Sequence, residues 1–376
     1  MKYMGSKRAM LRNGLGKLLA DEAPRASRFV DLFTGSGAVA RHVAQSQPVP
    51  VLAADLQEYS VALAAAVICR NRALDATRIW EEWFSTAEQF VAKLAKPPAI
   101  SRKSASEVAA ARMWSEAQAG LPITAAYGGH YFSPFQTIWL DALRFSLPRQ
   151  KESRQLALAS LIQAASHCAA SPGHTAQPFQ PTKTAKKFLF ESWARSIVDQ
   201  TRGNLSLLAS LAAQEKGAAV RADANILAGE MTEDDLVFLD PPYSGVHYSR
   251  FYHVLESVAS GSPGIVSGIG RYPPSISRPR SRYSVQTEAA AALDELLGSL
   301  GRNGAKVILT FPDHECSNGL SGEQVQIIAS RYFRIRRKVI SSRFSSLGGT
   351  SDGRANQAGR NARLNAQELI LLLRPL

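Results

Sequence analysis

The sequence predicts an α/β protein whose mostly parallel, Rossmann-like sheet carries helices on both faces and is interrupted by an inserted, mostly helical domain. Two apolar segments support this prediction, residues 29–33 and residues 236–239. The first runs into a glycine-rich turn and then a helical pattern, and the second stops at two consecutive prolines. Both patterns are typical of buried strands that end at a turn. In open α/β sheets, ligands bind at the carboxyl ends of such strands.

The first strand, Phe29-Val30-Asp31-Leu32-Phe33, is followed by Thr34-Gly35-Ser36-Gly37 and by a helical segment over 38–43. The two glycines let a ligand approach the backbone closely, and the start of a helix offers free N–H groups. With Ala40 the turn completes a G-x-G-x-x-A pattern, which also occurs in dinucleotide-binding proteins. The turn therefore predicts a nucleotide-like ligand.

Asp31 argues against a dinucleotide. An acid four residues before Gly35 would repel a pyrophosphate, whereas it would attract the sulfonium and ammonium groups of S-adenosylmethionine. A second acid, Asp55, follows the short apolar strand 51–54 and is placed to bind ribose hydroxyls. Together these residues favour S-adenosylmethionine as the cofactor.

Residues 72–218 have the composition of a mostly helical insertion, with helices expected over 105–119 and 156–170. Between them, residues 127–134 form an aromatic and glycine-rich loop, which fits either a core anchor or a loop that stacks on nucleic-acid bases. A short basic run fits either a solvated helix face or contacts with phosphates. Its charged residues are Lys183, Lys186 and Lys187.

The second strand, 236–239, ends in the tetrad Asp240-Pro241-Pro242-Tyr243. These residue types suit methylation of the exocyclic amine of adenine, a poor nucleophile because its lone pair is delocalised into the ring. The carboxylate of Asp240 and the carbonyl of Pro241 would accept both amine hydrogens and so free the lone pair. Proline suits this position because its φ is fixed. Tyr243 would stack on a base turned out of the duplex.

Residues 270–283 combine three prolines with four arginines and no acid, so they cannot form a regular helix or a central strand. Because this loop follows the tetrad, we expect its arginines to contact the DNA backbone. They are Arg271, Arg278, Arg280 and Arg282. The net charge of +13 over 376 residues also favours a polyanionic partner. Much of the excess lies in residues 250–376, where 17 Lys and Arg stand against 9 Asp and Glu.

The three cysteines stand apart, without a C-x-x-C pair, and the seven histidines show no metal-binding spacing. We therefore expect neither a metal site nor a disulfide framework, and a reducing cytoplasm is the default compartment. The longest apolar run, residues 61–69, is too short to cross a membrane. The N-terminus has no signal-peptide pattern.

On these motifs, the chain resembles the Dam-like (alpha-group) DNA adenine-N6 methyltransferases. Residues 2–7, Lys-Tyr-Met-Gly-Ser-Lys, are similar to the family's N-terminal aromatic-x-G-x-K segment. Residues 31–37 are similar to its glycine motif, and residues 240–243 to its catalytic tetrad. The expected strands over 306–310, 336–343 and 368–373 follow in the family's order.

The resemblance implies a Rossmann-like S-adenosylmethionine-dependent methyltransferase sheet formed by residues 1–71 and 219–376, with residues 72–218 as an inserted, helical target-recognition domain. The implied catalytic residues are Asp240, Pro241, Pro242 and Tyr243. The implied cofactor-binding residues are Tyr3, Lys7, Asp31, Phe33, Gly35, Gly37, Asp55, Asp223 and Asp240. The implied reaction is site-specific methylation of adenine N6 in double-stranded DNA, with base flipping and S-adenosyl-L-methionine as methyl donor.

Other interpretations stay open. The tetrad also occurs in enzymes that methylate adenine in RNA, and its relatives act on cytosine N4 or on a glutamine amide. A DNA-binding module that has lost catalysis is a further alternative, although the intact acid, glycines and tyrosine argue against it. A cognate restriction nuclease or another defence-system protein is a candidate partner. We expect a monomer on DNA, in the prokaryotic cytoplasm and associated with the nucleoid.

Overall fold

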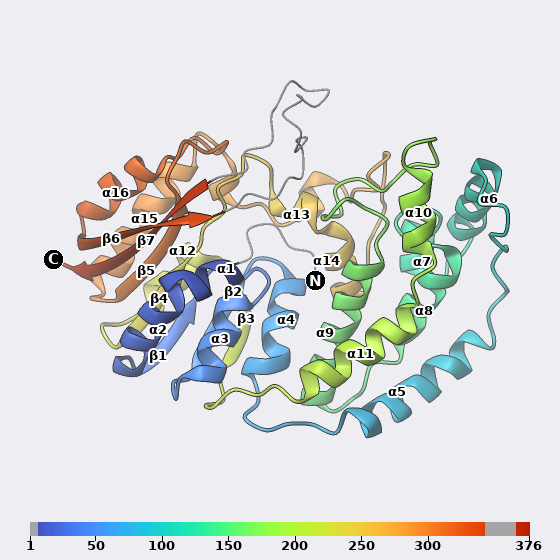
Figure 1. Cartoon of the computed structure of the whole chain (residues 1–376), viewed down its shortest axis with the longest axis horizontal. Helices are drawn as coiled ribbons and strands as arrows, with labels where there is room; N and C mark the ends of the chain where they lie inside the picture. Colours follow the sequence, from blue (N-terminus) through green and yellow to red (C-terminus); the bar gives the residue numbers. More distant parts are fainter. Residues whose placement is uncertain (1–6, 343–365) are drawn as a thin grey trace.

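The computed structural model describes residues 7–342 and 366–376, and within them seven strands form a single sheet. The strand order is β3-β2-β1-β4-β5-β7-β6 (Figure 1). The strands are β1 (Arg28–Asp31), β2 (Val51–Asp55), β3 (Ala218–Arg221), β4 (Asp235–Leu239), β5 (Lys306–Pro312), β6 (Phe333–Ser342) and β7 (Ala366–Pro375). The predicted α/β sheet is confirmed, and β1 and β4 are the strands whose ends carry the two motifs.

The topology brings these two motifs together. Strands β1 to β5 are parallel, and β7 runs antiparallel to both β5 and β6. The chain places β2 and β3 on one side of β1, and β4 and β5 on the other. The strand order therefore reverses between β1 and β4, and at such a switch point the carboxyl ends of the strands border a crevice. Asp31 at the end of β1 pairs in register with Phe238 of β4, so both motifs leave the sheet side by side.

Helices cover both faces of the sheet because successive strand residues point to opposite sides. The elements of these two layers are α1 (Arg8–Met10), η1 (Leu11–Leu15), α2 (Gly16–Glu22), η2 (Ala23–Arg25), α3 (Ala38–Ser46), α12 (Ala224–Leu227), η3 (Ala228–Glu230), η5 (Arg282–Ser284), α15 (Ala289–Arg302) and α16 (Gly322–Ser330). On one face, Phe29, Phe238 and Ile370 pack with residues of α2 and α3. On the other, Val237 and Leu371 pack with residues of α15 and α16.

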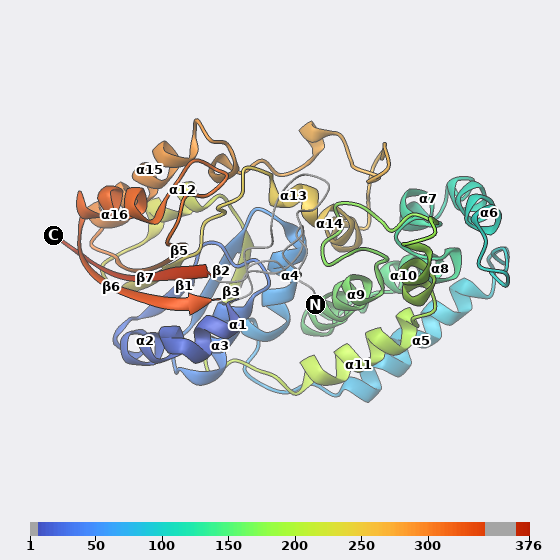
Figure 2. The same ribbon diagram turned by 45° about the horizontal axis from the view of Figure 1, so that its top comes forward.

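A helical region lies to one side of the sheet (Figure 2). Its helices are α4 (Glu58–Ile68), α5 (Ala76–Val91), α6 (Ala105–Glu116), α7 (Pro122–Tyr127), α8 (Pro134–Phe145), α9 (Lys151–Cys168), α10 (Lys186–Trp193), α11 (Ile197–Ala209), α13 (Tyr248–Phe251) and α14 (His253–Ser260). Helix α4 joins it to the sheet, because Ile68 packs in a core beneath the strands while Leu63 and Val67 pack in the helical core. This core also contains residues of α14. The helical core is therefore built from segments that come before β3 in the sequence and from a segment that comes after β4.

The aromatic loop over 127–134 belongs to the helical core. Tyr127, Tyr131 and Phe132 are fully buried, and the rings of Tyr127 and Tyr131 contact His253 of α14 edge-on. The loop then leads into α8, whose N-cap residue forms a capping box. Of the two interpretations that the sequence left open, the structure therefore supports the core anchor.

Two further observations bear on function. Within residues 7–342 and 366–376, no helix combines the length and apolar character that crossing a membrane requires. The same ranges contain no group of three or more His, Cys, Asp or Glu side chains arranged to hold a metal ion.

Candidate functional site

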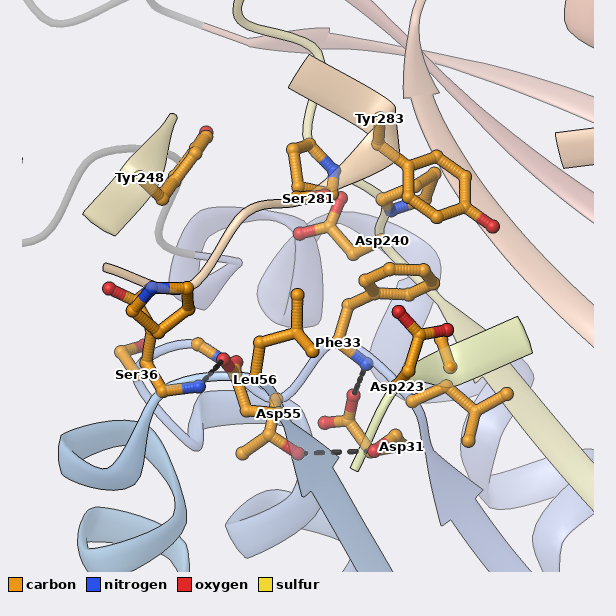
Figure 3. A pocket seen from close by; sticks show the side chains of 18 of the residues that line it. Asp31, Phe33, Ser36, Asp55, Leu56, Asp223, Asp240, Tyr248, Ser281 and Tyr283 are labelled. Atoms are coloured by element: carbon orange, nitrogen blue, oxygen red, sulfur yellow. Dashed lines mark hydrogen bonds between the residues drawn. The ribbon is translucent and has the colours of Figure 1, made fainter. Parts of the chain in front are cut away.

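A cavity opens at the carboxyl ends of β1, β2 and β4, beside the switch point of the sheet (Figure 3). Including the open solvent at its mouth, it encloses about 990 Å³. The sequence-predicted residues that line it are Lys7, Asp31, Phe33, Gly35, Asp55, Asp223, Asp240, Pro241, Pro242 and Tyr243. Gly37 is not in the lining but is the N-cap residue of α3, and Tyr3 lies outside the described residues.

The glycine turn adopts the conformation that its sequence favours. Gly35 and Gly37 have φ values of +50° and +70°, in the left-handed region that glycine enters without steric cost. The N–H of Gly35 donates to Oδ2 of Asp55 at 2.8 Å, and the N–H of Gln57 donates to Oδ1 at 2.9 Å. Asp55 therefore holds the glycine turn in place while it lines the cavity, a contact that the sequence did not reveal.

Asp31 is a buried carboxylate at the carboxyl end of β1. It is 1% exposed, and in the part of the chain that the structure describes no Lys, Arg or His forms an ion pair with it. The N–H of Phe33 donates to its Oδ1 at 3.3 Å. Burial raises the pKa of Asp31 to about 8, and the charges of Asp240 and Asp55 contribute to the rise. A positive charge on a ligand would be stabilised at this position.

We expect the substitution Asp31→Asn to stabilise the ligand-free protein at high pH. Well below about pH 4 the Asp31 carboxyl is protonated in both the folded and the unfolded state, so it does not change the free energy of unfolding. The pKa of Asp31 in the folded protein is about 8. As the pH rises toward this value, Asp31 ionises first in the unfolded state. The wild-type free energy of unfolding therefore falls by up to about 1.4 kcal/mol per pH unit in this window, and the asparagine variant avoids that fall.

Urea unfolding of both proteins across this pH window measures the difference. The advantage of Asp31→Asn should be near zero at the acid end and largest above about pH 8. Asp21 on α2 is exposed and supplies the control, since Asp21→Asn should leave the pH dependence as in the wild type. A variant that is less stable than the wild type at the alkaline end would contradict the prediction.

The carboxylate of Asp240 belongs to a buried ionic cluster with Lys7 and Glu368. Lys7 Nζ lies 3.0 Å from Oδ1 of Asp240 and 3.2 Å from Oε2 of Glu368, and the Lys7 side chain is 6% exposed. Thr310 Oγ1 donates to the same Oδ1 at 3.0 Å. Burial lowers the pKa of Lys7, but the two carboxylates outweigh burial and raise this pKa overall. Lys7 therefore stays charged and compensates the acids beside it.

Two hydrogen-bond acceptors at the end of β4 have no partner within residues 7–342 and 366–376. Oδ1 of Asp240 takes the contacts of Lys7 and Thr310, so its Oδ2 has no partner among the residues that the structure describes. The carbonyl of Pro241 accepts no hydrogen bond from those residues either. Burial raises the pKa of Asp240, and Lys7 opposes this rise. Adjacent residues thus offer a carboxylate oxygen and a carbonyl oxygen to a polar group of a ligand.

Aromatic rings line the rest of the cavity, and one asparagine outside it contacts the tetrad. Tyr243 packs edge-on against Phe311, with ring centres 6.3 Å apart. Tyr283 packs edge-on against Phe33 at 5.1 Å. Asn318 Nδ2 donates to the carbonyls of Pro242 and Tyr283, both at 3.0 Å. The Asn318 side chain therefore links the turn after β4 to the segment before α15 and stabilises the position of the tetrad.

Four residues that line the cavity or hold its side chains in place were not predicted from the sequence. They are Thr310, Glu368, Asn318 and Tyr283. Of these, Glu368 carried a usable signal, because it is an acid at the head of the otherwise apolar run 369–373. A charged residue in a buried strand needs a partner, and here that partner is Lys7.

The arginines predicted to contact DNA lie outside the cavity lining, and three of the four are paired with acids of the chain. The pairs are Arg271–Glu116, Arg280–Glu288 and Arg282–Glu295. Arg271 also donates to the backbone carbonyls of Ala125 and Ala126, which fastens its loop to the end of α7. The predicted basic run, Lys183, Lys186 and Lys187, is exposed at the start of α10.

The chain is similar in sequence to known methyltransferases over segments that form this site. The sequence model of a family described as D12 class N6 adenine-specific DNA methyltransferases matches residues 3–269. Modification methylase StsI of Streptococcus sanguinis is 24% identical over 322 residues, which are 83% of this chain and 44% of that protein. The chain therefore spans less than half the length of this curated relative. The family match includes the glycine turn, the helical region and the tetrad.

Proposed function

The chain belongs to the D12 class of N6 adenine-specific DNA methyltransferases, and on this premise we propose that it transfers a methyl group from S-adenosylmethionine to the N6 amine of adenine in DNA. The observation that carries the proposal is a pair of acceptors, Asp240 Oδ2 and the Pro241 carbonyl, that accept no hydrogen bond from the described residues and belong to residues lining the cavity. An amine with two hydrogens is the group that such a pair fits.

S-adenosylmethionine supplies, when bound, a methyl group that is activated by its attachment to a positively charged sulfur. The cavity fits a cation because the buried carboxylate of Asp31 pairs with no Lys, Arg or His among the residues that the structure describes. Asp55 would bind ribose hydroxyls with the acceptor capacity that its two backbone contacts leave. The open glycine turn at Gly35 and Gly37 lets a ligand approach the backbone. Asp223, in the same lining, is available to the adenine of the cofactor.

The tetrad acts on the base through hydrogen bonding. When Asp240 and the Pro241 carbonyl accept both hydrogens of the N6 amine, the nitrogen becomes more tetrahedral and its lone pair is freed for attack. Lys7 and Thr310 hold Oδ1 of Asp240, so Oδ2 is oriented before the base arrives. Positioning and electrostatics of this kind supply most of the acceleration.

A base paired inside a duplex cannot reach this cavity, so we propose that the target adenine is turned out of the helix. Tyr243 stacks on the extruded base, and its contact with Phe311 holds the ring. The inserted segment over residues 72–218, which forms most of the helical region, is the proposed target-recognition domain. A relative that is a modification methylase makes a restriction nuclease the first partner to look for.

The proposal is tested by expressing the protein in cells that lack adenine methylation and sequencing their genomic DNA with a modification-sensitive method. We expect N6-methyladenine confined to one short sequence motif, and none in cells that express the Asp240→Asn variant. Unmodified DNA from the wild-type strain, with S-adenosylmethionine binding retained, would overturn the proposal and direct the search to an RNA substrate or an essential partner subunit.

A further inference from the structure

Two arginines next to the active-site cavity share one aromatic ring. The guanidinium carbon of Arg250, on α13, lies 4.8 Å from the centre of the Tyr272 ring. That of Arg278, directly after η4 (Ser275–Ser277), lies 5.8 Å from the same centre. Each distance is in the range of a cation–π contact. Arg250 is exposed and Arg278 is half-buried, so a ligand can reach both.

The charge of this pair is not compensated within the described chain. Arg271, Arg280 and Arg282 each contact a carboxylate, but neither Arg250 nor Arg278 forms an ion pair within residues 7–342 and 366–376. Arg278 Nε is buried and has no hydrogen-bond partner there. Burial lowers the pKa of Arg278, and the charge of Arg250 lowers it further. Two like charges that stay side by side without an acid favour an anionic ligand.

The ring beneath the two arginines is held firmly. Its hydroxyl donates to the carbonyl of Ala176, and its ring centre lies 4.9 Å from that of His253. The backbone of Tyr272 exchanges hydrogen bonds of 2.9 and 3.0 Å with Ser267. His253 in turn is 2.9 Å from the carbonyl of Gly270. Tyr272 is therefore a fixed platform, and the two guanidinium groups are positioned before any ligand arrives.

The platform lies beside the mouth of the cavity. Pro279, the residue after Arg278, lines the cavity together with Ser281 and His247. Burial lowers the pKa of His247, and the charges of Arg280 and Arg278 lower it further. Helix α13 lies on the side of the helical region that faces the sheet (Figures 1 and 2). A base that enters the cavity would bring its own backbone phosphates to this edge.

We propose that Arg250 and Arg278 form a phosphate clamp that grips the DNA backbone next to the extruded adenine; this inference rests on the proposed function. Guanidinium groups bind phosphate oxygens with paired, charge-assisted hydrogen bonds, and Tyr272 keeps both groups oriented for this. The sequence predicted DNA-backbone contacts for all four arginines of the loop over 270–283. In the clamp, Arg278 is the phosphate ligand from this loop, and Arg250 from α13 is the second ligand.

The test is the salt dependence of binding to a fluorescently labelled DNA duplex. Each phosphate contact that is lost should reduce the slope of log K against log salt by about one unit. We expect this reduction for Arg250→Gln and for Arg278→Gln, and about twice as much for the double variant. Arg278→Lys should keep most of the slope, because it retains the charge. Arg280→Gln and Arg282→Gln are matched controls, and both should keep the wild-type slope.

Thermal unfolding separates the clamp from a structural role. Since the substitutions relieve repulsion between two like charges, Arg250→Gln should not lower the melting temperature, whereas a residue that holds its loop would lower it. Wild-type slopes in the double variant would overturn the clamp even if genomic methylation is found. A reduced slope in a protein that methylates no DNA would support the clamp and reject the proposed function. A reduction with RNA but not with duplex DNA would overturn the assignment to DNA.

Discussion

Replacing Asp240 with asparagine is expected to slow methylation by about a thousandfold while the protein stays folded. Asparagine keeps the size of the side chain and one acceptor oxygen. That oxygen will face Lys7 and Thr310, which hold Oδ1 in the wild type. The amide NH2 then stands where Oδ2 was, so a donor meets the amine hydrogens of the base. The amine loses one of its two acceptors, and its lone pair stays delocalised in the ring.

Single-turnover methylation of a DNA fragment that carries the recognised motif measures this effect without interference from product release. Asp235 supplies the matched control, because it is a buried carboxylate at the other end of β4 and lies 2.8 Å from Arg28. Asp235→Asn should lower the melting temperature and leave the rate per folded molecule near that of the wild type. An Asp240→Asn enzyme that keeps a tenth or more of the wild-type rate would refute the role of the tetrad.

The sequence predicted those site residues whose place at the end of a strand follows from the residues next to them. A strand that ends in glycines or prolines must end there in any fold, so Asp31 and Asp240 could be placed at strand ends without a structure. Their proximity follows from the parallel order of β1 and β4. The strands expected over 306–310, 336–343 and 368–373 overlap β5, β6 and β7, but their order was taken from the resemblance to the family.

The partners in ion pairs between distant parts of the sequence were not predictable. Glu368 reaches Lys7 across 361 positions of sequence. It does so because antiparallel pairing sets it opposite Pro312 at the end of β5, and no local pattern defines that register. The arginine loop shows the same limit: counting charges could not reveal that Arg280 and Arg282 face Glu288 and Glu295.

The substitution Lys7→Met is expected to reduce methylation near neutral pH by about a hundredfold and to cost about 3 to 5 kcal/mol of stability. It leaves the carboxylates of Asp240 and Glu368 buried without the cation between them. In the wild type, burial raises the pKa of Asp240 and the charge of Lys7 opposes this rise. Without Lys7 this pKa rises further, so a smaller fraction of Asp240 is ionised and able to accept the amine hydrogens.

The pH–rate profile tests this explanation because two substitutions should move it in opposite directions. Methylation needs ionised Asp240, so its rate rises as the pH passes the pKa of that group. In Lys7→Met the acid limb should move to higher pH, and raising the pH should restore activity. Glu368 raises the pKa of Asp240, so Glu368→Gln should move the limb to lower pH. Limbs that stay in place in both variants would show that the cluster only supports the fold.

The double variant Lys7→Met, Glu368→Gln separates charge balance from simple loss of contacts. If lost packing and hydrogen bonds dominate, removing both partners must be worse than removing Lys7 alone. If uncompensated charge dominates, the double variant has one buried carboxylate where Lys7→Met has two, and it should be the more stable of the two proteins. Its acid limb should also lie below that of Lys7→Met, because the pKa of Asp240 no longer feels Glu368. Urea unfolding and pH–rate profiles of the four proteins complete this cycle.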